Sequence, residues 1–452
     1  YYIEEKRAKE NNEVLLIANG DMFEGTAFSN LSFGMSTLNV MNQMQFDMMG
    51  VGNHEYSWGL DSILKFFDND DTNGEANFPL INGNIYTDSK RYGEDILDDN
   101  ILPYTIVEKG DFKIGILSYI GDIASSISKS YLETYKIQAD ETYFRTQIKN
   151  DALKLKEAGA DFIVFNIHDG DSKSIFNFQT NRIVSELTDS NGNYLIDAII
   201  NGHTHSKQSG IYNRGKSKVP MVQGGCYCDT FGEMTLVINK QTKKVINATS
   251  NVIYTDSISK YDKEKNVQKV IEEEYDKIID TVEKTYCYNA NEISRQALGN
   301  LMAKEIRKAT SADISIINTG GIRTVLEQGD ITFKKIYEVY PFENHMICFK
   351  TKGKYLNDWI ENEASYYYMD YDIDSNYDTP FDDEVIYNVT TIDYVYDSTY
   401  FTDSFLEYEI VSISNKITPR DYLIDDLINR GNQSFNINGE IKVKVKGFGE
   451  LE

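Results

Sequence analysis

The chain has 452 residues, of which 41% are hydrophobic and 12% aromatic, and this composition excludes a disordered polypeptide. A chain of this length exceeds one ordinary hydrophobic core, so two domains are expected. The formal net charge of −26 argues against binding to nucleic acid polymers or to anionic membranes. The same charge repels phosphate at long range, so a phosphate site in this chain would need a local positive centre such as a metal ion.

Targeting and redox signals are sparse. No stretch approaches about 18 uninterrupted apolar residues, so no transmembrane segment is predicted. No signal peptide is recognised either, because residues 1–7 read as an amphipathic helix already under way. The cysteines follow no zinc-binding or disulfide spacing and are expected to be free thiols: Cys226, Cys228, Cys287 and Cys348.

The first half of the chain alternates short apolar runs with helical patterns. Buried strands that end in polar loops are predicted at 14–18, 47–51, 161–166 and 198–200. A helix is predicted near 34–44, and further strands at 104–107, 113–119, 234–238 and 245–252. This order predicts an α/β fold with mixed sheets stacked on each other, and such sheets place functional residues at strand ends.

The second half predicts a separate α/β unit. A charged helix over about 257–284 would connect the two parts, and a helix from Ser294 leads to a strand at 313–317. The acidic, Tyr-rich stretch 370–383 is predicted to be a surface loop. We therefore expect a first domain over 1–255, a connecting helix over 256–285 and a second domain over 286–452.

Metal-ligating side chains gather at the predicted strand ends of the first half: Asp21, Asn53, His168, His203 and His205. Carboxylate, amide oxygen and imidazole suit two divalent ions of the Zn, Mn, Fe or Co class, which a bridging carboxylate at Asp21 could hold together. His203 and His205 are two residues apart on an extended segment, so both side chains could face one site.

Each of these motifs is weak by itself, because Gly, Asn and Asp populate ordinary turns and a single histidine is usually structural. Four of the five histidines nevertheless follow a predicted strand and have a glycine within three residues: His54, His168, His203 and His205. Only His345 falls outside such a loop. The joint pattern predicts a metal site.

Several blocks together resemble the calcineurin-like metallophosphoesterases: Gly20-Asp21-x-x-x-Gly25, Gly52-Asn53-His54-Glu55, His168-x-Gly170 and Gly202-His203-Thr204-His205. With Asn318-x-Gly320-Gly321-x-Arg323 and Pro341-Phe342 they resemble the two-domain 5′-nucleotidase family, including its relatives that act on 2′,3′-cyclic nucleotides and nucleotide sugars. The blocks cover nearly the whole chain in the family's order, so the series is a strong signal.

The resemblance implies a role for each residue of the first domain. Asp21 would bridge two metals, Asn53, His168 and His203 would complete one of them, and His205 would bind the other. His54 would lie beside the scissile phosphate, where it would stabilise charge or protonate the leaving alkoxide. A metal-bound hydroxide would be the nucleophile, without a covalent intermediate.

The second domain would bind the nucleoside. By resemblance, Asn318 would contact the base and Arg323 the phosphate or ribose, while Gly320 and Gly321 would allow a tight turn beside the ligand. Phe342 would stack on one face of the base, and Tyr394 is our candidate for the second aromatic. Plain core packing is the alternative for both rings.

Three departures from the family affect these expectations. The family opens with an Asp-x-His strand ahead of the region that matches Tyr1, so either residues precede Tyr1 in the natural protein or the chain is impaired. Ser57 stands where the family often has an Asp that orients the histidine of Gly-Asn-His-Glu. The stretch 395–400 replaces the usual Gly-Gly-Asp-Gly-Phe, and Arg295 is not clearly in register with an expected arginine.

The resulting prediction is a four-layer α/β/β/α metallophosphatase domain joined by a helix to a second α/β nucleotide-binding domain. The predicted reaction is hydrolysis of a small-molecule nucleotide, most simply a nucleoside 5′-monophosphate. The alternatives are a 2′,3′-cyclic-nucleotide or nucleotide-sugar hydrolase of the same fold, or a nucleotide-binding protein that has lost turnover. The resemblance implies an extracellular, periplasmic or cell-surface location, and the oligomeric state is left open.

Overall fold

The computed structural model divides the chain into two compact units. The first unit comprises Tyr1–Glu24, Ser32–Ile127 and Tyr131–Glu274, and the second comprises Gly25–Leu31, Ser128–Ser130 and Tyr275–Glu452. The structure describes residues 1–88, 90–93, 100–169, 180–214, 217–362, 369–397, 408–414 and 418–430. Among these residues, no helix is both long enough and apolar enough to cross a membrane.

A small parallel sheet in the first unit carries two of the predicted loops. Its strands are β1 (Ile17–Ala18), β2 (Met48–Gly50) and β3 (Leu80–Ile81), in that order. β1 is shorter than the expected strand over 14–18, because the Asp47 carboxylate accepts the Leu16 N–H at 2.7 Å in place of a neighbouring strand's carbonyl.

The main sheet of the first unit has six strands in the order β11, β12, β10, β9, β7, β6. Strands β12, β10, β9 and β7 run parallel, and both edge strands are antiparallel to their neighbours. The strands span β6 (Tyr104–Lys109), β7 (Phe112–Ile120), β9 (Phe162–His168), β10 (Ala198–Asn201), β11 (Lys207–Arg214) and β12 (Ser217–Gly224).

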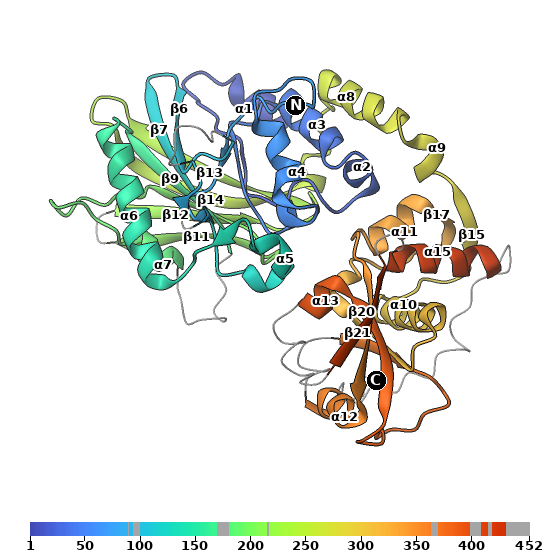
Figure 1. Cartoon of the computed structure of the whole chain (residues 1–452). Coiled ribbons are helices and arrows are strands. Elements are labelled where there is room, and N and C mark those ends of the chain that lie inside the picture. The colour runs from blue at the N-terminus through green and yellow to red at the C-terminus, as the bar shows by residue number, and fades with distance from the viewer. Residues whose placement is uncertain are drawn as a thin grey trace. The chain divides into compact units, whose positions relative to one another are not determined.

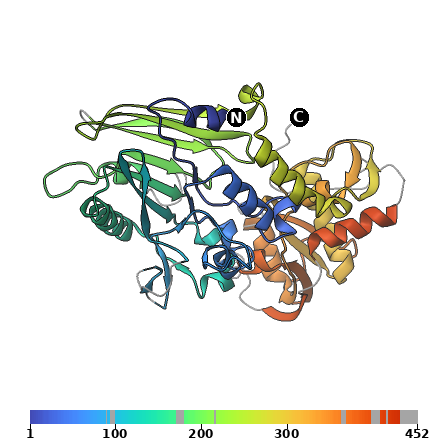
Figure 2. The same cartoon turned by 90° about the horizontal axis from the view of Figure 1, so that it is seen from above.

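Further elements cover this sheet (Figure 1). Helix α6 (Glu141–Glu157) buries Phe144 and Ile148 in one cluster with Leu117 and Phe165 of the central strands. A long hairpin, β13 (Thr230–Asn239) with β14 (Lys244–Tyr254), packs against β11 and β12 (Figure 2). Sheets, hairpin and helices therefore form the stacked α/β arrangement that the sequence predicts.

The remaining elements of the first unit are short. The helices are α1 (Tyr2–Arg7), α3 (Met35–Met44), α4 (Leu60–Leu64) and α7 (Thr180–Ser185). A three-stranded antiparallel sheet consists of β4 (Ile85–Thr87), β5 (Lys90–Arg91) and β8 (Lys136–Ile137). The predictions of a helix near 34–44 and of a helical start at residues 1–7 are confirmed.

The helix expected over about 257–284 is divided into two. The chain forms α8 (Lys265–Asp276) and then α9 (Ile279–Val282), after a 3-10 turn at Thr255–Ile258. Ile278 leaves the helical conformation, with φ −120° and ψ −4°, and packs beside Val282 and Tyr337 in a separate apolar cluster. Burial of these side chains outweighs the local preference for one continuous helix.

The second unit contains a five-stranded sheet in the order β19, β16, β20, β18, β21. The strands span β16 (Ile314–Asn318), β18 (Met346–Lys352), β19 (Met369–Ile373), β20 (Ile386–Ile392) and β21 (Tyr408–Ser414), beside a β15 (Thr285–Asn289) and β17 (Gly329–Thr332) pair. Its helices are α2 (Ala27–Asn30), α10 (Arg295–Thr310), α11 (Phe333–Val339), α12 (Gly353–Asn362), α13 (Asp393–Asp397) and α15 (Pro419–Arg430), while α5 (Lys129–Leu132) begins in this unit. The helix expected from Ser294 is α10, and Ser294 caps it by accepting a hydrogen bond from the Ala297 N–H.

The prediction of a surface loop over 370–383 is wrong at its start, because β19 pairs antiparallel with β16 over Ile314–Asn318. Two aspartates that made this stretch look like a loop are held by Arg307, whose guanidinium lies 2.5 Å from Asp372 and 2.5 Å from Asp374. Tyr371 and Ile373 point to the core between them. Alternating charged and apolar residues therefore form an edge strand here.

Candidate metal centre

Two polar loops of the first unit approach each other as closely as their backbones allow. Gly20 has a φ of +82°, and a Cβ at this position would lie 2.4 Å from the Gly52 nitrogen. A Cβ on Gly52 would lie 2.3 Å from Asp21 Oδ1. Both positions therefore need glycine, and their contact brings the loop after β1 against the loop after β2.

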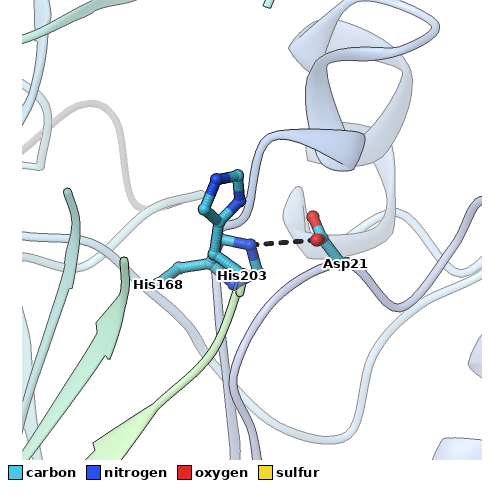
Figure 3. Close-up of side chains that lie close together, drawn as sticks. All are labelled: Asp21, His168 and His203. Atoms are coloured by element: carbon cyan, nitrogen blue, oxygen red, sulfur yellow. Dashed lines mark ion pairs between the residues drawn. The ribbon is translucent and has the colours of Figure 1, made fainter. Parts of the chain in front are cut away.

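Three predicted ligands come together at this point. The carboxylate of Asp21 and the imidazoles of His168 and His203 offer ligand atoms that all lie within 4.8 Å of one another (Figure 3). His168 Nε2 lies 2.9 Å from Asp21 Oδ2. His203 Nδ1 lies 2.9 Å from Asn53 Oδ1, so this fourth predicted ligand also adjoins the group. His168 ends β9 and His203 follows β10, its parallel neighbour in the main sheet, whereas Asp21 and Asn53 follow β1 and β2 of the small sheet.

The orientation of His168 fits a metal ligand. Its Nδ1–H donates to the Asn19 carbonyl at 2.6 Å, so Nε2 is the ring nitrogen that faces Asp21. Nε2 is buried and makes no hydrogen bond of acceptable geometry, despite its 2.9 Å distance from the carboxylate. A buried nitrogen without a hydrogen bond, held by a carbonyl behind it, is the usual arrangement of a metal-binding histidine.

The charges of the group also suit a divalent cation. Burial opposes ionisation of Asp21, but the imidazoles of His168 and His54 outweigh it and lower the pKa of this carboxyl group. Burial, with the neighbouring His168, lowers the pKa of His203 to about 4. An ionised Asp21 and a neutral His203 are the forms that bind metals. Burial opposes protonation of His168, but the Asp21 carboxylate outweighs it and raises the pKa of this imidazole, so a metal bound there would displace its proton.

His205 lies outside the three-residue group, although both His203 and His205 were expected to face one site. Its ring packs edge-on against Tyr227, with 5.5 Å between ring centroids. Asp21, His203 and His205 share a left-handed backbone, with φ of 56°, 69° and 56°. Non-glycine residues rarely adopt this conformation, and such strain concentrates at functional loops.

His54 begins a 3-10 turn, His54–Tyr56, directly after Asn53. Its backbone N–H donates to Asp21 Oδ1 at 2.9 Å, and its ring Nδ1 lies 2.6 Å from Glu24 Oε2. Ser57 Oγ donates to the same Glu24 oxygen at 2.6 Å. The sequence offered no signal for Glu24, an acidic residue in a polar loop and 30 positions before His54.

Glu55 is a second residue whose role the sequence did not reveal. Its side chain is fully buried and accepts the backbone N–H groups of Asp21 at 2.7 Å, Met22 at 2.8 Å and Gly52 at 2.7 Å. Burial, and then the charge of Asp21, raise the pKa of this carboxyl group. Glu55 thus links the loop after β1, through Asp21 and Met22, to the loop after β2, through Gly52.

In the second unit, the predicted nucleoside-binding residues surround the turn after β16. Asn318 ends that strand, and its Oδ1 is buried without a hydrogen bond. A Cβ on Gly321 would lie 2.9 Å from the Tyr340 ring, so the turn packs closely there, and Gly320 accepts a hydrogen bond from Arg323 at 3.2 Å.

The two predicted aromatic residues lie at the margin of the core. Arg323 lies over the Phe342 ring, 5.7 Å from its centroid. Phe342 and Tyr394 are both partly buried against the second unit's core, and burial raises the pKa of the Tyr394 hydroxyl. Arg295 donates from Nε to the Ile322 carbonyl at 2.7 Å, so it supports the turn that carries Arg323. Gly170 and part of the divergent stretch 395–400 lie outside the described residues.

A carboxylate and imidazoles at the ends of parallel strands, in this α/β fold, define the class of metal-dependent phosphoesterases. The family model for calcineurin-like phosphoesterases matches residues 2–207, and the model for the 5′-nucleotidase C-terminal domain matches residues 278–400. The chain belongs to the family of proteins that combine these two domains.

Individual relatives agree with this assignment. The chain is 27% identical over 381 residues to the endonuclease YhcR of Bacillus subtilis, covering 80% of this chain and 30% of that protein. It is 25% identical over 400 residues to a snake venom 5′-nucleotidase of Crotalus adamanteus, covering 80% and 63%. The crystal structure of a 5′-nucleotidase precursor from Thermus thermophilus has the same fold, with TM-score 0.76, 16% identity and coverage of 95% and 90%.

Proposed function

We propose that this chain hydrolyses nucleoside 5′-monophosphates to nucleoside and phosphate in a metal-dependent reaction. The observation that carries the proposal is the grouping of Asp21, His168 and His203, with Asn53 adjoining, in a calcineurin-like phosphoesterase fold. The relatives named 5′-nucleotidase support the substrate class. The chain spans less than two thirds of the first relatives it matches, 30% of one and 63% of another, so their activities come to it only as proposals.

The grouping of Asp21, His168 and His203 supports one metal position, and His205 enters the proposal by resemblance to the family alone. Asp21, Asn53, His168 and His203 would hold one divalent ion of the Zn, Mn, Fe or Co class, and His205 with Asp21 would serve a second. When bound, such ions polarise the phosphate and lower the pKa of a bound water. The buried Glu55 would keep Asp21 in place while the ion is bound.

The chain's own catalytic group is His54. During hydrolysis, water oxygen bonds to phosphorus, the P–O5′ bond breaks, and the electron pair of that bond goes to O5′. His54 would give a proton from its ring to O5′, so that the nucleoside leaves as an alcohol, and the proton lost by water would restore the ring through solvent. No residue of the chain becomes covalently attached to phosphate.

Recognition of the nucleoside is assigned to the second unit. Asn318 offers a buried acceptor without a hydrogen bond, which suits an N–H donor on a base. Phe342 and Tyr394 would stack on the base, and Arg323 would contact ribose or phosphate. The relatives from snake venom support a secreted or surface location for this chain as well.

An activity panel tests the proposal. Phosphate release would be measured with added Mn or Zn for AMP, UMP, 2′,3′-cyclic AMP, UDP-glucose and a generic aryl phosphate. We expect turnover of AMP or UMP that a chelator abolishes and that His203→Ala removes. Normal activity of His203→Ala would refute the assignment of the centre.

The same panel separates the alternatives. Preference for the cyclic nucleotide or the nucleotide sugar would assign the chain to those hydrolases of the same fold. Nucleotide binding without turnover of any ester would mark a protein that has lost catalysis. Because one relative is named an endonuclease, single-stranded DNA is added as a further substrate in the panel. The net charge of −26 argues against its hydrolysis.

A further inference from the structure

The loop that carries Asp21 also carries a buried carboxylate that has no place in the metal group. The side chain of Glu24 is only 1% exposed, and its Oε2 receives two hydrogen bonds of 2.6 Å, from the His54 ring and from the Ser57 hydroxyl. A buried carboxylate is retained only where hydrogen bonds or charges compensate for its lost hydration. Here the compensation comes from His54 and from its neighbour Ser57.

We propose that Glu24 is the positioning residue of His54: its carboxylate accepts the Nδ1–H hydrogen bond and thereby orients the ring for proton transfer from Nε2, with Ser57 fixing the carboxylate. This inference rests on the proposed function, because His54 is the proton donor in that reaction. The family often has an aspartate at position 57 that orients this histidine. Here position 57 holds a serine, and the carboxylate of Glu24, from another loop, would orient the ring instead.

The geometry fixes which ring nitrogen would reach the leaving group. The two ring nitrogens of a histidine are distinct, and the hydrogen bond at one decides what the other can do. With Nδ1–H donated to Glu24, a proton passed to O5′ comes from Nε2. The His54 backbone N–H, donated to Asp21 Oδ1 at 2.9 Å, ties the same residue to the metal group. Ring and backbone are therefore held by two separate carboxylates.

Ser57 acts through Glu24 and not on the ring. Its hydroxyl donates to the oxygen that already accepts from His54, so it restricts the carboxylate to the rotamer that faces the ring. The Ser57 hydroxyl and the His54 Nδ1 each lie 2.6 Å from the same Glu24 oxygen, so a longer side chain at position 57 would extend toward the ring. An aspartate there is one atom longer than serine and would bring its own carboxylate toward the place of the Glu24 oxygen.

Kinetics of Glu24→Gln against two substrates test the proposal. AMP has a poor leaving group, an alkoxide that needs a proton, whereas 4-nitrophenyl phosphate releases a stable phenolate. We expect kcat for AMP to fall by roughly 10–100-fold, with KM little changed, while kcat for the aryl ester falls far less. A merely structural role would lower both rates alike, and that result would overturn the proposal.

The double variant Glu24→Gln/Ser57→Asp restores a carboxylate near the His54 ring, now from position 57 instead of position 24. We expect it to recover most of the lost AMP turnover, whereas a double variant no more active than Glu24→Gln would contradict the proposed role. Glu141→Gln is the matched control, because this exposed glutamate pairs with Arg145 at the surface and its replacement should leave both rates unchanged. Ser57→Ala serves as the second variant should Glu24→Gln fail to fold, and its smaller loss should again be confined to AMP.

A readout without metal or turnover completes the test. In metal-free protein labelled with ¹⁵N-histidine, the His54 signals are assigned by their loss in His54→Asn. We expect a protonated, hydrogen-bonded Nδ1 in the wild type, a changed Nδ1 signal in Glu24→Gln, and its return in the double variant. An Nδ1 signal identical in all three proteins would overturn the pairing. If the wild type hydrolyses no nucleotide, the proposed function fails, and this measurement still decides the pairing.

Discussion

Glu55 Oε2 accepts the backbone N–H of Asp21 at 2.7 Å, so Glu55, the residue after His54, holds the backbone of Asp21, whose carboxylate lies in the metal group. The same side chain accepts from Met22 and Gly52 and has no exposed surface. One glutamate therefore satisfies three backbone donors in two loops, one of them buried and two partly buried.

Replacing Glu55 by Ala should lower the free energy of unfolding by about 3–5 kcal/mol, because three backbone N–H groups, one buried and two partly buried, lose their carboxyl acceptor. Urea unfolding of both proteins measures this. Glu141→Ala removes an exposed glutamate and should change stability by less than about 0.5 kcal/mol. Equal stability of the two variants would show that Glu55 does not hold the loops.

Replacing His203 by Ala should remove binding of Mn or Zn, because His203 supplies one of three clustered ligand atoms. Added metal at about 100 times its Kd stabilises a binding protein by about 2.7 kcal/mol, and this gain should disappear in the variant. Thermal unfolding with and without metal measures it. His345→Ala is the matched control, and a retained metal response in His203→Ala would contradict the assignment.

Replacing Phe342 by Ala should raise KM for AMP by roughly 5–150-fold, the equivalent of about 1–3 kcal/mol of base stacking. KM for a small aryl phosphate should stay near the wild-type value. Steady-state kinetics on both substrates decide the matter, with Tyr288→Ala as an exposed aromatic control in the same unit. Equal losses on both substrates would mean that the ring only fills the core.

The N-cap of α6 gives a pH-dependent prediction. Asp140 Oδ1 accepts the Tyr143 N–H at 3.0 Å, and this hydrogen bond lowers the pKa of the Asp140 carboxyl group. A lowered folded pKa contributes stability above the unfolded value, about 3.9, that is lost as pH falls through the folded pKa. Asp140→Ala should cost about 1 kcal/mol at pH 7, and the difference should shrink in acid.

Asp140→Ser is the control for the charge in that experiment, because a serine hydroxyl still caps the helix and does not titrate. Its stability difference from Asp140→Ala should stay constant between neutral and acid pH. The unfolding free energies of all three proteins, followed by circular dichroism across the pH range, measure both effects. A pH-independent gap between wild type and Asp140→Ala would refute the role of the ionised cap.

Local patterns revealed much of the fold and part of the site. Strands that end in polar loops predicted that His168 and His203 would lie together, and both lie beside Asp21, because parallel strands bring their carboxyl ends to one edge. Glu24 and Glu55 could not be found this way, since each acts through a hydrogen bond to a residue of another loop. The strand β19 was missed because Arg307, distant in sequence, neutralises its aspartates.

The contact between Gly20 and Gly52 limits how this centre can be rebuilt. A methyl group added at Gly20 would clash with the Gly52 backbone, and one added at Gly52 would clash with Asp21, so the shapes of the two loops depend on each other. A chimaera that takes the Asp21 loop from a relative and leaves the Gly52 loop in place would join two surfaces that were never matched. Transplanting metal specificity between members of this family would therefore require both loops to be exchanged as one piece.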